Sequence, residues 1–312
     1  MYFPLLRGKQ YELVALKEFA EENPGSQTVC PIIEPVRVLP DVLVRAAEIL
    51  SQHGMRYCVV LNPEKGDFVL ETNRFEIGDY LNRFGNLAIQ PIPAFIADGN
   101  SASVMKMIER NDLHDVMVIF EDAFDIENID DDALCNNRDV SYIVCGPVDS
   151  RSNKRYLMRT KKHIIRLDDC FVVRKPNTAY RGIDEDPYTE EPFYYDEDNF
   201  YGFSDYCVLP KAFVEGGTTP AAVAIHLTYK KRNDAIWVRH FVSDEEYEKE
   251  NIRNKFENAV KKVVEFYSDI TPTDAVSWLL ANKDRYPGLG ALKKITVKNH
   301  LELISNILTP VE

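Results

Sequence analysis

Three carboxylate residues each end a run of apolar residues in this 312-residue chain. Glu34, Glu121 and Asp168 close runs that are typical of strands buried on both faces. Converging carboxylate oxygens are the ligands that hard divalent cations such as Mg²⁺ prefer, and a bound cation can activate water. These residues therefore predict a possible metal site, and with Lys9 as a further catalytic candidate they suggest hydrolysis of a phosphodiester or nucleotide.

Polar residues that could hold phosphate lie at or just after the ends of the first three strand-like runs. Arg7 and Arg37 supply positive charge and Asn62 supplies an amide. The alternative is that Arg7, Lys9 and Arg37 neutralise the carboxylates in a buried ion-pair network that only fills the space. We favour the network, and whether the chain is an enzyme stays open.

Two histidines are symmetric about a predicted hairpin turn. His226 and His240 are equidistant from Asn233, between apolar runs at 223–230 and 236–243, so they should face each other on paired strands. Facing imidazoles can share a metal ion, but two histidines make an incomplete ligand set. Packing of both rings against their neighbours is the favoured interpretation.

These candidates need a framework, and apolar runs alternate with helix-like segments over the first two thirds of the chain. Eight such units predict an α/β fold in which a parallel sheet closes into a TIM-type barrel, with an open doubly wound sheet as the alternative. The predicted strands are Tyr2–Leu6, Cys30–Val36, Tyr57–Asn62, Ala88–Ile96, Val116–Glu121, Tyr142–Gly146, His163–Asp168 and Phe203–Leu209. The predicted helices between them are Gln10–Glu22, Pro40–His53, Arg74–Phe84, Ser101–Asn111, Asp130–Asn137 and Arg151–Lys161.

The remaining segments predict additions to the barrel. Residues 183–199 carry eight acidic residues and no Lys or Arg, which indicates a long solvated loop or a docking surface. Gly216-Gly217 reads as a turn, and Ser243 with Glu246 has capping-box spacing for the last barrel helix. We expect a barrel over residues 1–267, including the acidic loop and hairpin 223–243, and a helical extension over 268–312.

Composition limits the functional classes. A net charge of −13 and a pI near 5.0 argue against non-specific nucleic-acid binding, although a local basic site stays possible. No stretch is apolar enough for a membrane span, and the N-terminus lacks an export signal, so we expect a cytoplasmic protein. The six cysteines show no metal-ligand spacing and read as reduced thiols. No dinucleotide, P-loop, zinc-protease or serine-hydrolase motif is present.

Several segments resemble the phage and bacterial beta-protein family. They are YFPLLRGKQYELVALKEF at 2–19, IIEP at Ile32–Pro35, YGFSDYCVLPKAFVEGGTTPAAVAIHLTY at Tyr201–Tyr229 and HFVSD at His240–Asp244. Members look like proteins of mobile elements and defence loci, and the namesake suppresses an adjacent killer gene. The resemblance implies an accessory or antitoxin-like component of a phage-defence or toxin-neutralising system that binds a protein encoded by a neighbouring gene. It assigns no role to single residues and leaves the oligomeric state open.

Overall fold

The computed structural model describes residues 1–122, 128–146, 148, 150–215, 219–268 and 270–309. The chain divides into two compact units. The barrel unit comprises Met1–Asp169 and Glu191–Tyr206, and the C-terminal unit comprises Cys170–Glu190 and Cys207–Glu312. This division differs from the expected boundary at residue 267. The predicted hairpin forms a sheet with residues 185–189 and packs against the helices that follow residue 251, so it belongs to the C-terminal unit. Gly216-Gly217 lies outside the described residues.

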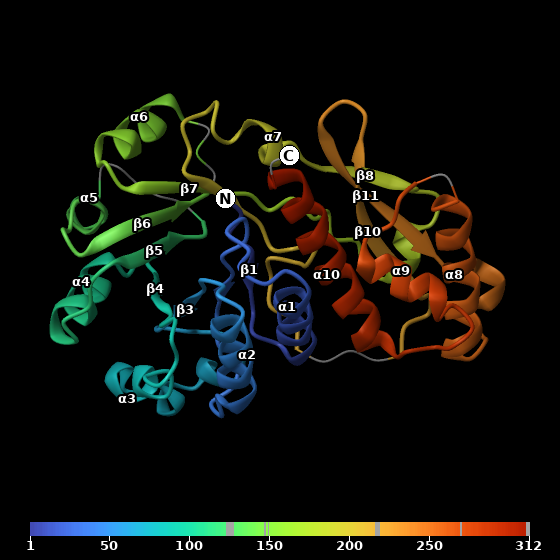
Figure 1. Ribbon diagram of the computed structural model, residues 1–312, viewed down its shortest axis with the longest axis horizontal. Helices are drawn as coiled ribbons and strands as arrows, with labels where there is room; N and C mark the ends of the chain where they lie inside the picture. Colours follow the sequence, from blue (N-terminus) through green and yellow to red (C-terminus); the bar gives the residue numbers. More distant parts are fainter. Residues whose placement is uncertain (123–127, 147, 149, 216–218, 269, 310–312) are drawn as a thin grey trace. The chain divides into compact units, whose positions relative to one another are not determined.

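The barrel unit is an eight-stranded parallel sheet in the order β1-β2-β3-β4-β5-β6-β7-β9 (Figure 1). The two edge strands meet, since the Phe3 amide donates to the Phe203 carbonyl at 2.8 Å and the Leu5 amide donates to that of Asp205 at 2.9 Å. The predicted TIM-type α/β barrel is therefore confirmed. The strands are β1 (Leu5–Leu6), β2 (Ile32–Ile33), β3 (Cys58–Val60), β4 (Ile92–Ile96), β5 (Val116–Phe120), β6 (Val140–Cys145), β7 (His163–Leu167) and β9 (Gly202–Ser204).

Alternation along the strands fills the barrel interior. One side chain in two points inward and joins a single apolar cluster. Its buried members are Phe3, Leu5, Cys30, Ile32, Cys58, Val60, Ala94, Ile96, Met117, Ile119, Tyr142, Val144, Ile165, Leu167 and Tyr206. The next inward position on each strand lies two residues further on, at the carboxyl end.

Helices of the barrel unit lie around the sheet, and all but α7, which falls in the expected acidic loop, are near their predicted positions (Figure 1). They are α1 (Gln10–Glu22), α2 (Asp41–Gln52), α3 (Ile77–Asn82), α4 (Ser101–Arg110), α5 (Ile129–Cys135), α6 (Arg151–Arg159) and α7 (Glu191–Tyr194). The helix expected at Arg74–Phe84 is shorter, because two 3₁₀ turns precede it: η1 (Gly66–Val69) and η2 (Glu71–Asn73). Gly66 opens η1 with a φ of +64°, which a side chain would strain.

A three-stranded antiparallel sheet forms the frame of the C-terminal unit, in the order β10-β11-β8. The predicted hairpin is β10 (Ala224–Lys231) and β11 (Ala235–Val242), and β8 (Glu185–Thr189) pairs with β11. The expected acidic loop is therefore wrong over 185–189, where the chain adds a strand to the sheet. A 3₁₀ turn, η3 (Asn177–Tyr180), precedes β8.

Three helices complete the C-terminal unit: α8 (Ile252–Phe266), α9 (Asp274–Ala281) and α10 (Leu289–Leu308). The expected capping box at Ser243 is wrong, because the Asn251 side chain caps α8 and Ser243 Oγ accepts from the Val223 amide at 3.1 Å. Another 3₁₀ turn, η4 (Glu245–Tyr247), occupies the intervening segment. Leu227, Phe241 and Phe256 belong to the core that joins helices and sheet.

Among the described residues, no helix is both long and apolar enough to cross a membrane. All six cysteines are free thiols, as expected, and five of them are buried. The Cys58 sulfur, on β3, lies 3.9 Å from the sulfur of Cys30, which precedes β2.

Candidate functional site at the barrel mouth

Charged side chains continue the inward-facing rows beyond the apolar interior. Arg7 lies two residues after Leu5, and Glu121 lies two residues after Ile119, both of which belong to the interior cluster. Arg7, Glu34 and Glu121 are buried, with Glu34 fully inaccessible to solvent. The period of two in the strands thus brings groups from three distant segments to the carboxyl end of the barrel.

Arg7 and Lys65 each bridge the same two glutamates. The Arg7 guanidinium lies 2.5 Å from Glu34 Oε2 through Nη1 and 2.6 Å from Glu121 Oε1 through Nη2. Lys65 Nζ lies 3.1 Å from Glu34 Oε2 and 3.0 Å from Glu121 Oε2. Two cations and two carboxylates form a closed, formally neutral arrangement, which we call the mouth network.

Neighbouring groups orient the mouth network. The Tyr206 hydroxyl donates to Glu121 Oε1 at 3.0 Å, and the Arg7 guanidinium carbon lies 5.2 Å from the centre of the Tyr206 ring. Glu12, in the first turn of α1, accepts from the Arg7 backbone amide at 2.8 Å. Contacts on both its backbone and its side chain therefore hold Arg7 in one position.

Local charges set the protonation of the mouth network. Burial raises the pKa of Glu121, but the charges and hydrogen bonds of Arg7 and Lys65 outweigh that effect and hold the pKa at about 2. Burial, and then the neighbouring Glu121 carboxylate, raise the pKa of Tyr206. At neutral pH Glu121 is ionised and Tyr206 is a neutral donor.

A further carboxylate supports the end of β5. Asp98 accepts from the backbone amides of Glu121 at 2.9 Å and Asp122 at 3.1 Å. Burial nevertheless raises the pKa of Asp98, and the nearby Glu121 and Asp122 carboxylates add to this increase. Asp98 thus positions the backbone that carries Glu121.

Asp168 does not join the mouth network. Leu167 points into the interior, so Asp168 points the other way, and its carboxylate accepts from Arg166 Nε at 2.7 Å. Arg166 also contacts Glu191 at 3.3 Å. Within the described residues, Glu34, Glu121 and Asp168 do not bring one oxygen each to within 4.8 Å of one another. The three carboxylates therefore do not converge as expected, because strand alternation turns Asp168 away from Glu34 and Glu121.

Of the other predicted site residues, Arg37 and Asn62 make contacts outside the mouth network. Arg37 is exposed and contacts Asp67 at 2.9 Å. Lys9 is half-buried immediately before α1, and its carbonyl accepts from the Leu13 amide. The Asn62 side chain donates to the Ile96 carbonyl at 2.7 Å and accepts from the Ile96 amide at 2.9 Å. Asn62 therefore extends the pairing of β3 with β4.

Sequence reasoning missed Lys65 and Tyr206. Lys65 lies in the loop after β3, where no periodicity shows its direction. Tyr206 was included in a predicted strand but not among the site residues, although counting in steps of two from the inward side would have selected it. The same count favours Asp169 over Asp168 at the end of β7. To predict which side chains lie at the barrel mouth, one must know which residues of each strand face inward.

His226 and His240 face each other as predicted, in the C-terminal unit. Their Nδ1 atoms lie 2.8 Å apart, and His240 Nε2 lies 2.9 Å from Asp186 Oδ2. Arg174 donates to the same carboxylate, and the Tyr180 ring lies 4.7 Å from each imidazole. The rings contact each other and Asp186, as expected for packed histidines. The nitrogens that face each other are engaged in this hydrogen-bond chain.

No protein-family model matches this chain, and no curated protein matches it. The mouth network does not fit a resident divalent cation, because Arg7 and Lys65 already occupy oxygens of both carboxylates.

Two loops beside the mouth network expose apolar side chains. Val38 and Leu39 follow β2, while Val69 and Leu70 follow β3, with exposed fractions of 42%, 78%, 71% and 62%. We call these four residues the apolar rim. Asp67 joins the loops by accepting from Arg37 Nη1 at 2.9 Å and from the Val38 amide at 3.1 Å. The apolar rim is thus held by charged and backbone contacts, whereas its own side chains remain exposed.

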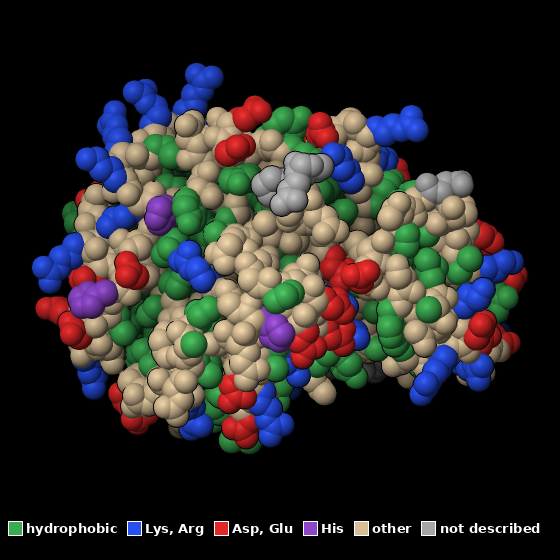
Figure 2. Space-filling model, viewed as in Figure 1, with side chains coloured by type: hydrophobic (Ala, Val, Ile, Leu, Met, Phe, Trp, Pro, Cys, Tyr) green, Lys and Arg blue, Asp and Glu red, His purple; other side chains and the backbone are tan. Residues whose placement is uncertain are grey.

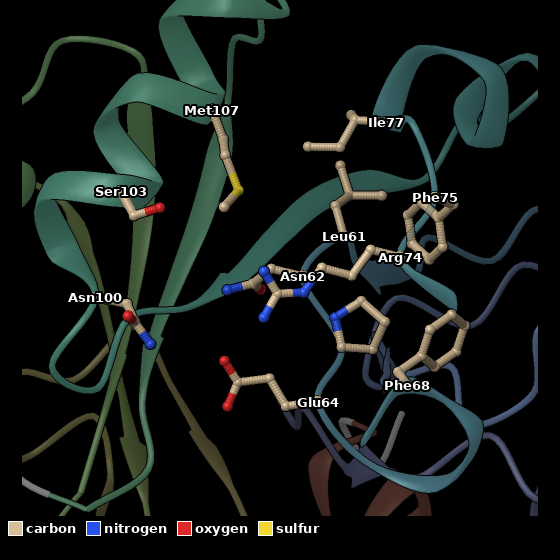
Figure 3. A pocket seen from close by; sticks show the side chains of 11 residues that line it. Leu61, Asn62, Glu64, Phe68, Arg74, Phe75, Ile77, Asn100, Ser103 and Met107 are labelled. Atoms are coloured by element: carbon tan, nitrogen blue, oxygen red, sulfur yellow. The ribbon is translucent and has the colours of Figure 1, made fainter. Parts of the chain in front are cut away.

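A pocket of about 150 Å³ adjoins the second of these loops (Figure 3). Leu61, Ile77 and Met107 lie along its apolar side, whereas the Arg74 guanidinium and the Glu64 carboxylate lie on its polar side (Figure 3). An apolar cavity with a few polar groups is typical of a place where a ligand or a partner side chain binds.

Proposed function

We propose that this chain is an antitoxin-like component of a phage-defence or toxin-neutralising system, and that it binds a protein partner through the apolar rim. The observation that carries this proposal is the exposure of Val38, Leu39, Val69 and Leu70 on two loops that Asp67 joins. Exposed apolar residues on adjoining loops, bordered by polar groups, are typical of protein-interaction sites.

The chemistry of the mouth network supports binding over metal-dependent hydrolysis. Glu34 and Glu121 are each paired with two cations, and Asp168 faces away from them. The resemblance of the N-terminal and Tyr201–Tyr229 segments to the beta-protein family adds support for an accessory role. The proposed partner is a protein encoded by a neighbouring gene.

The pocket beside the apolar rim provides an anchor point. Interfaces gain most of their binding energy from a few large side chains inserted into such pockets. Phe68 and Phe75 border this pocket, and their rings contact each other edge to face at a centroid distance of 5.5 Å. A partner's apolar side chain would be buried there against aromatic carbon.

The acidic segment gives less support for partner binding. Glu185 accepts from Lys231 and Arg239, while Asp186 accepts from Arg174 and His240. These carboxylates are neutralised within the C-terminal unit. We therefore assign the interaction to the apolar rim and not to the charge of Glu185 and Asp186.

Native mass spectrometry after co-expression with the neighbouring genes tests the proposal. We expect a stoichiometric complex for the wild type and loss of most of that complex in Leu39→Asp/Leu70→Asp. Ile129→Asp is the matched control, because Ile129 is 83% exposed on α5 and lies outside the apolar rim. A complex that both variants retain, or that the control loses equally, would contradict the assignment.

A further inference from the structure

Helix α6 and the residues after it are strongly basic in a chain whose net charge is −13. Residues 151–162 contain six Lys or Arg and no Asp or Glu. Figure 2 shows Lys and Arg side chains gathered over α6. Like charges one turn apart destabilise a helix, and α6 fully buries only Leu157, so neither helix formation nor packing requires these cations.

Three arginines form a row along α6. Arg151, Arg155 and Arg159 are exposed and follow one another at intervals of four residues, which is about 6 Å along the axis of a helix. They form no ion pair with any residue that the structure describes. Their positive charge is therefore available for a ligand.

Two other cations of the segment are partly used within the fold. Lys154 contacts Asp198 at 2.5 Å and lies 5.0 Å from the centre of the Phe200 ring. Lys162 donates to the carbonyls of Asn137 at 2.8 Å and Val140 at 2.6 Å. These two lysines therefore contribute to the fold, whereas the three arginines of the row form no such contact within the described part of the chain.

The arginine row borders a groove of about 600 Å³. Its helix side is lined by Arg151, Lys154, Arg155, Met158 and Arg159, and its other side by Asp198 and Asn199. Four cations and one carboxylate give this lining a formal charge of +3. Among the described residues, no aromatic side chain on which an unpaired base could stack lines the groove.

We propose that this groove binds the phosphate backbone of duplex DNA. Regularly spaced arginines suit a polyanion with repeated phosphates, because a guanidinium donates two parallel hydrogen bonds to one phosphate. The absence of a stacking platform in the groove favours a duplex over a single strand. The whole-chain charge argues against such binding, but phosphates within the groove respond mainly to nearby charges, since salt screens distant ones.

The test measures binding of a labelled DNA duplex by fluorescence anisotropy over a series of salt concentrations. Log affinity falls as log salt rises. In the variant Arg151→Gln/Arg155→Gln/Arg159→Gln this fall should be less steep, with a slope smaller in magnitude by about 2.7. For a fourfold increase in salt, wild-type affinity should then fall about 40-fold more than that of the variant. Replacement of the same arginines by Lys should retain most of the slope, because it retains the charge.

The matched control is Arg45→Gln/Arg83→Gln/Lys106→Gln, which removes three exposed cations from other parts of the barrel unit. We expect its salt dependence to equal that of the wild type. Equal losses in both triple variants would show a bulk charge effect and overturn the proposal, as would a wild type that does not bind duplex at low salt.

Two competitors test the class of ligand. Tighter binding of the corresponding single strand would overturn the duplex assignment. Displacement of the duplex by polyglutamate at equal charge concentration would show that the groove prefers acidic protein segments, and would overturn the nucleic-acid assignment. Retention of the duplex against polyglutamate is the result we expect.

Discussion

His226 and His240 approach each other through their Nδ1 atoms at 2.8 Å across β10 and β11. Asp186 accepts from His240 Nε2, so the hydrogen-bond pattern assigns His240 Nδ1 as the acceptor of a proton carried by His226 Nδ1. This arrangement requires His240 to be neutral, because a proton on its Nδ1 would place two N–H groups against each other.

Replacement of His226 should change the pH dependence of stability. Burial, and then the neighbouring His240, lower the pKa of His226 to about 3, whereas the unfolded value is near 6.5. Below about pH 6.5 the unfolded chain therefore binds a proton that the folded chain does not, and stability falls as the pH falls toward 3. We expect His226→Asn to reduce the slope of the free energy of unfolding against pH by up to about 1.4 kcal/mol per pH unit. Urea unfolding at several pH values measures this slope.

His114→Asn is the control for that prediction, and its effect should have the opposite sign. The hydrogen bond to Asp139 raises the pKa of His114, so the stability from this pair is present at low pH and is lost as the pH rises through the raised pKa. If the free energy of unfolding of His226→Asn depends on pH as it does in the wild type, protonation of His226 does not contribute to the loss of stability at low pH.

Removal of Arg7 should destabilise the barrel strongly. Arg7→Met leaves buried Glu34 and Glu121 with Lys65 as the remaining cation of the mouth network. Breaking a buried ion pair from one side costs about 3–5 kcal/mol, because the remaining charges stay desolvated. Urea unfolding should show that loss, while Arg37→Met, at an exposed pair with Asp67, should cost no more than about 1 kcal/mol. Equal losses would contradict the role of the buried network.

Divalent cations should not stabilise the barrel. Since Arg7 and Lys65 occupy the oxygens of Glu34 and Glu121, addition of Mg²⁺ or Mn²⁺ should leave the melting temperature unchanged. Glu121→Gln is the informative variant. A metal-dependent rise in wild-type melting temperature that disappears in Glu121→Gln would show that the network opens to a cation.

Gly66 should not tolerate a side chain. Its φ is +64°, and an added Cβ would lie 2.3 Å from the Val36 carbonyl oxygen, where the two loops of the apolar rim meet. Gly66→Ala should therefore cost at least about 1–2 kcal/mol, measured by thermal or urea unfolding. Gly78→Ala provides the comparison, because Gly78 lies in α3 with no atom within 4 Å of an added Cβ, and it should be neutral or stabilising. Equal stability of both variants would contradict this account.

The sequence by itself determined the order of the elements and the class of fold. Apolar runs separated by helical periodicity placed all eight strands of the barrel, since a strand covered on both faces must be apolar throughout. Local symmetry about Asn233 also determined the facing of His226 and His240, because a short hairpin fixes register by counting residues.

Only the tertiary structure decided which charged groups meet. Lys65 reaches Glu34 and Glu121 from a loop whose direction no period reveals, whereas Asp168 turns outward because it lies one residue beyond the inward-facing Leu167. The division into two units likewise depends on β8 pairing with β11 about 50 residues later, which local patterns do not encode. Sequence periodicity fixes direction within an element, but contacts between distant elements depend on barrel closure and on loop conformation.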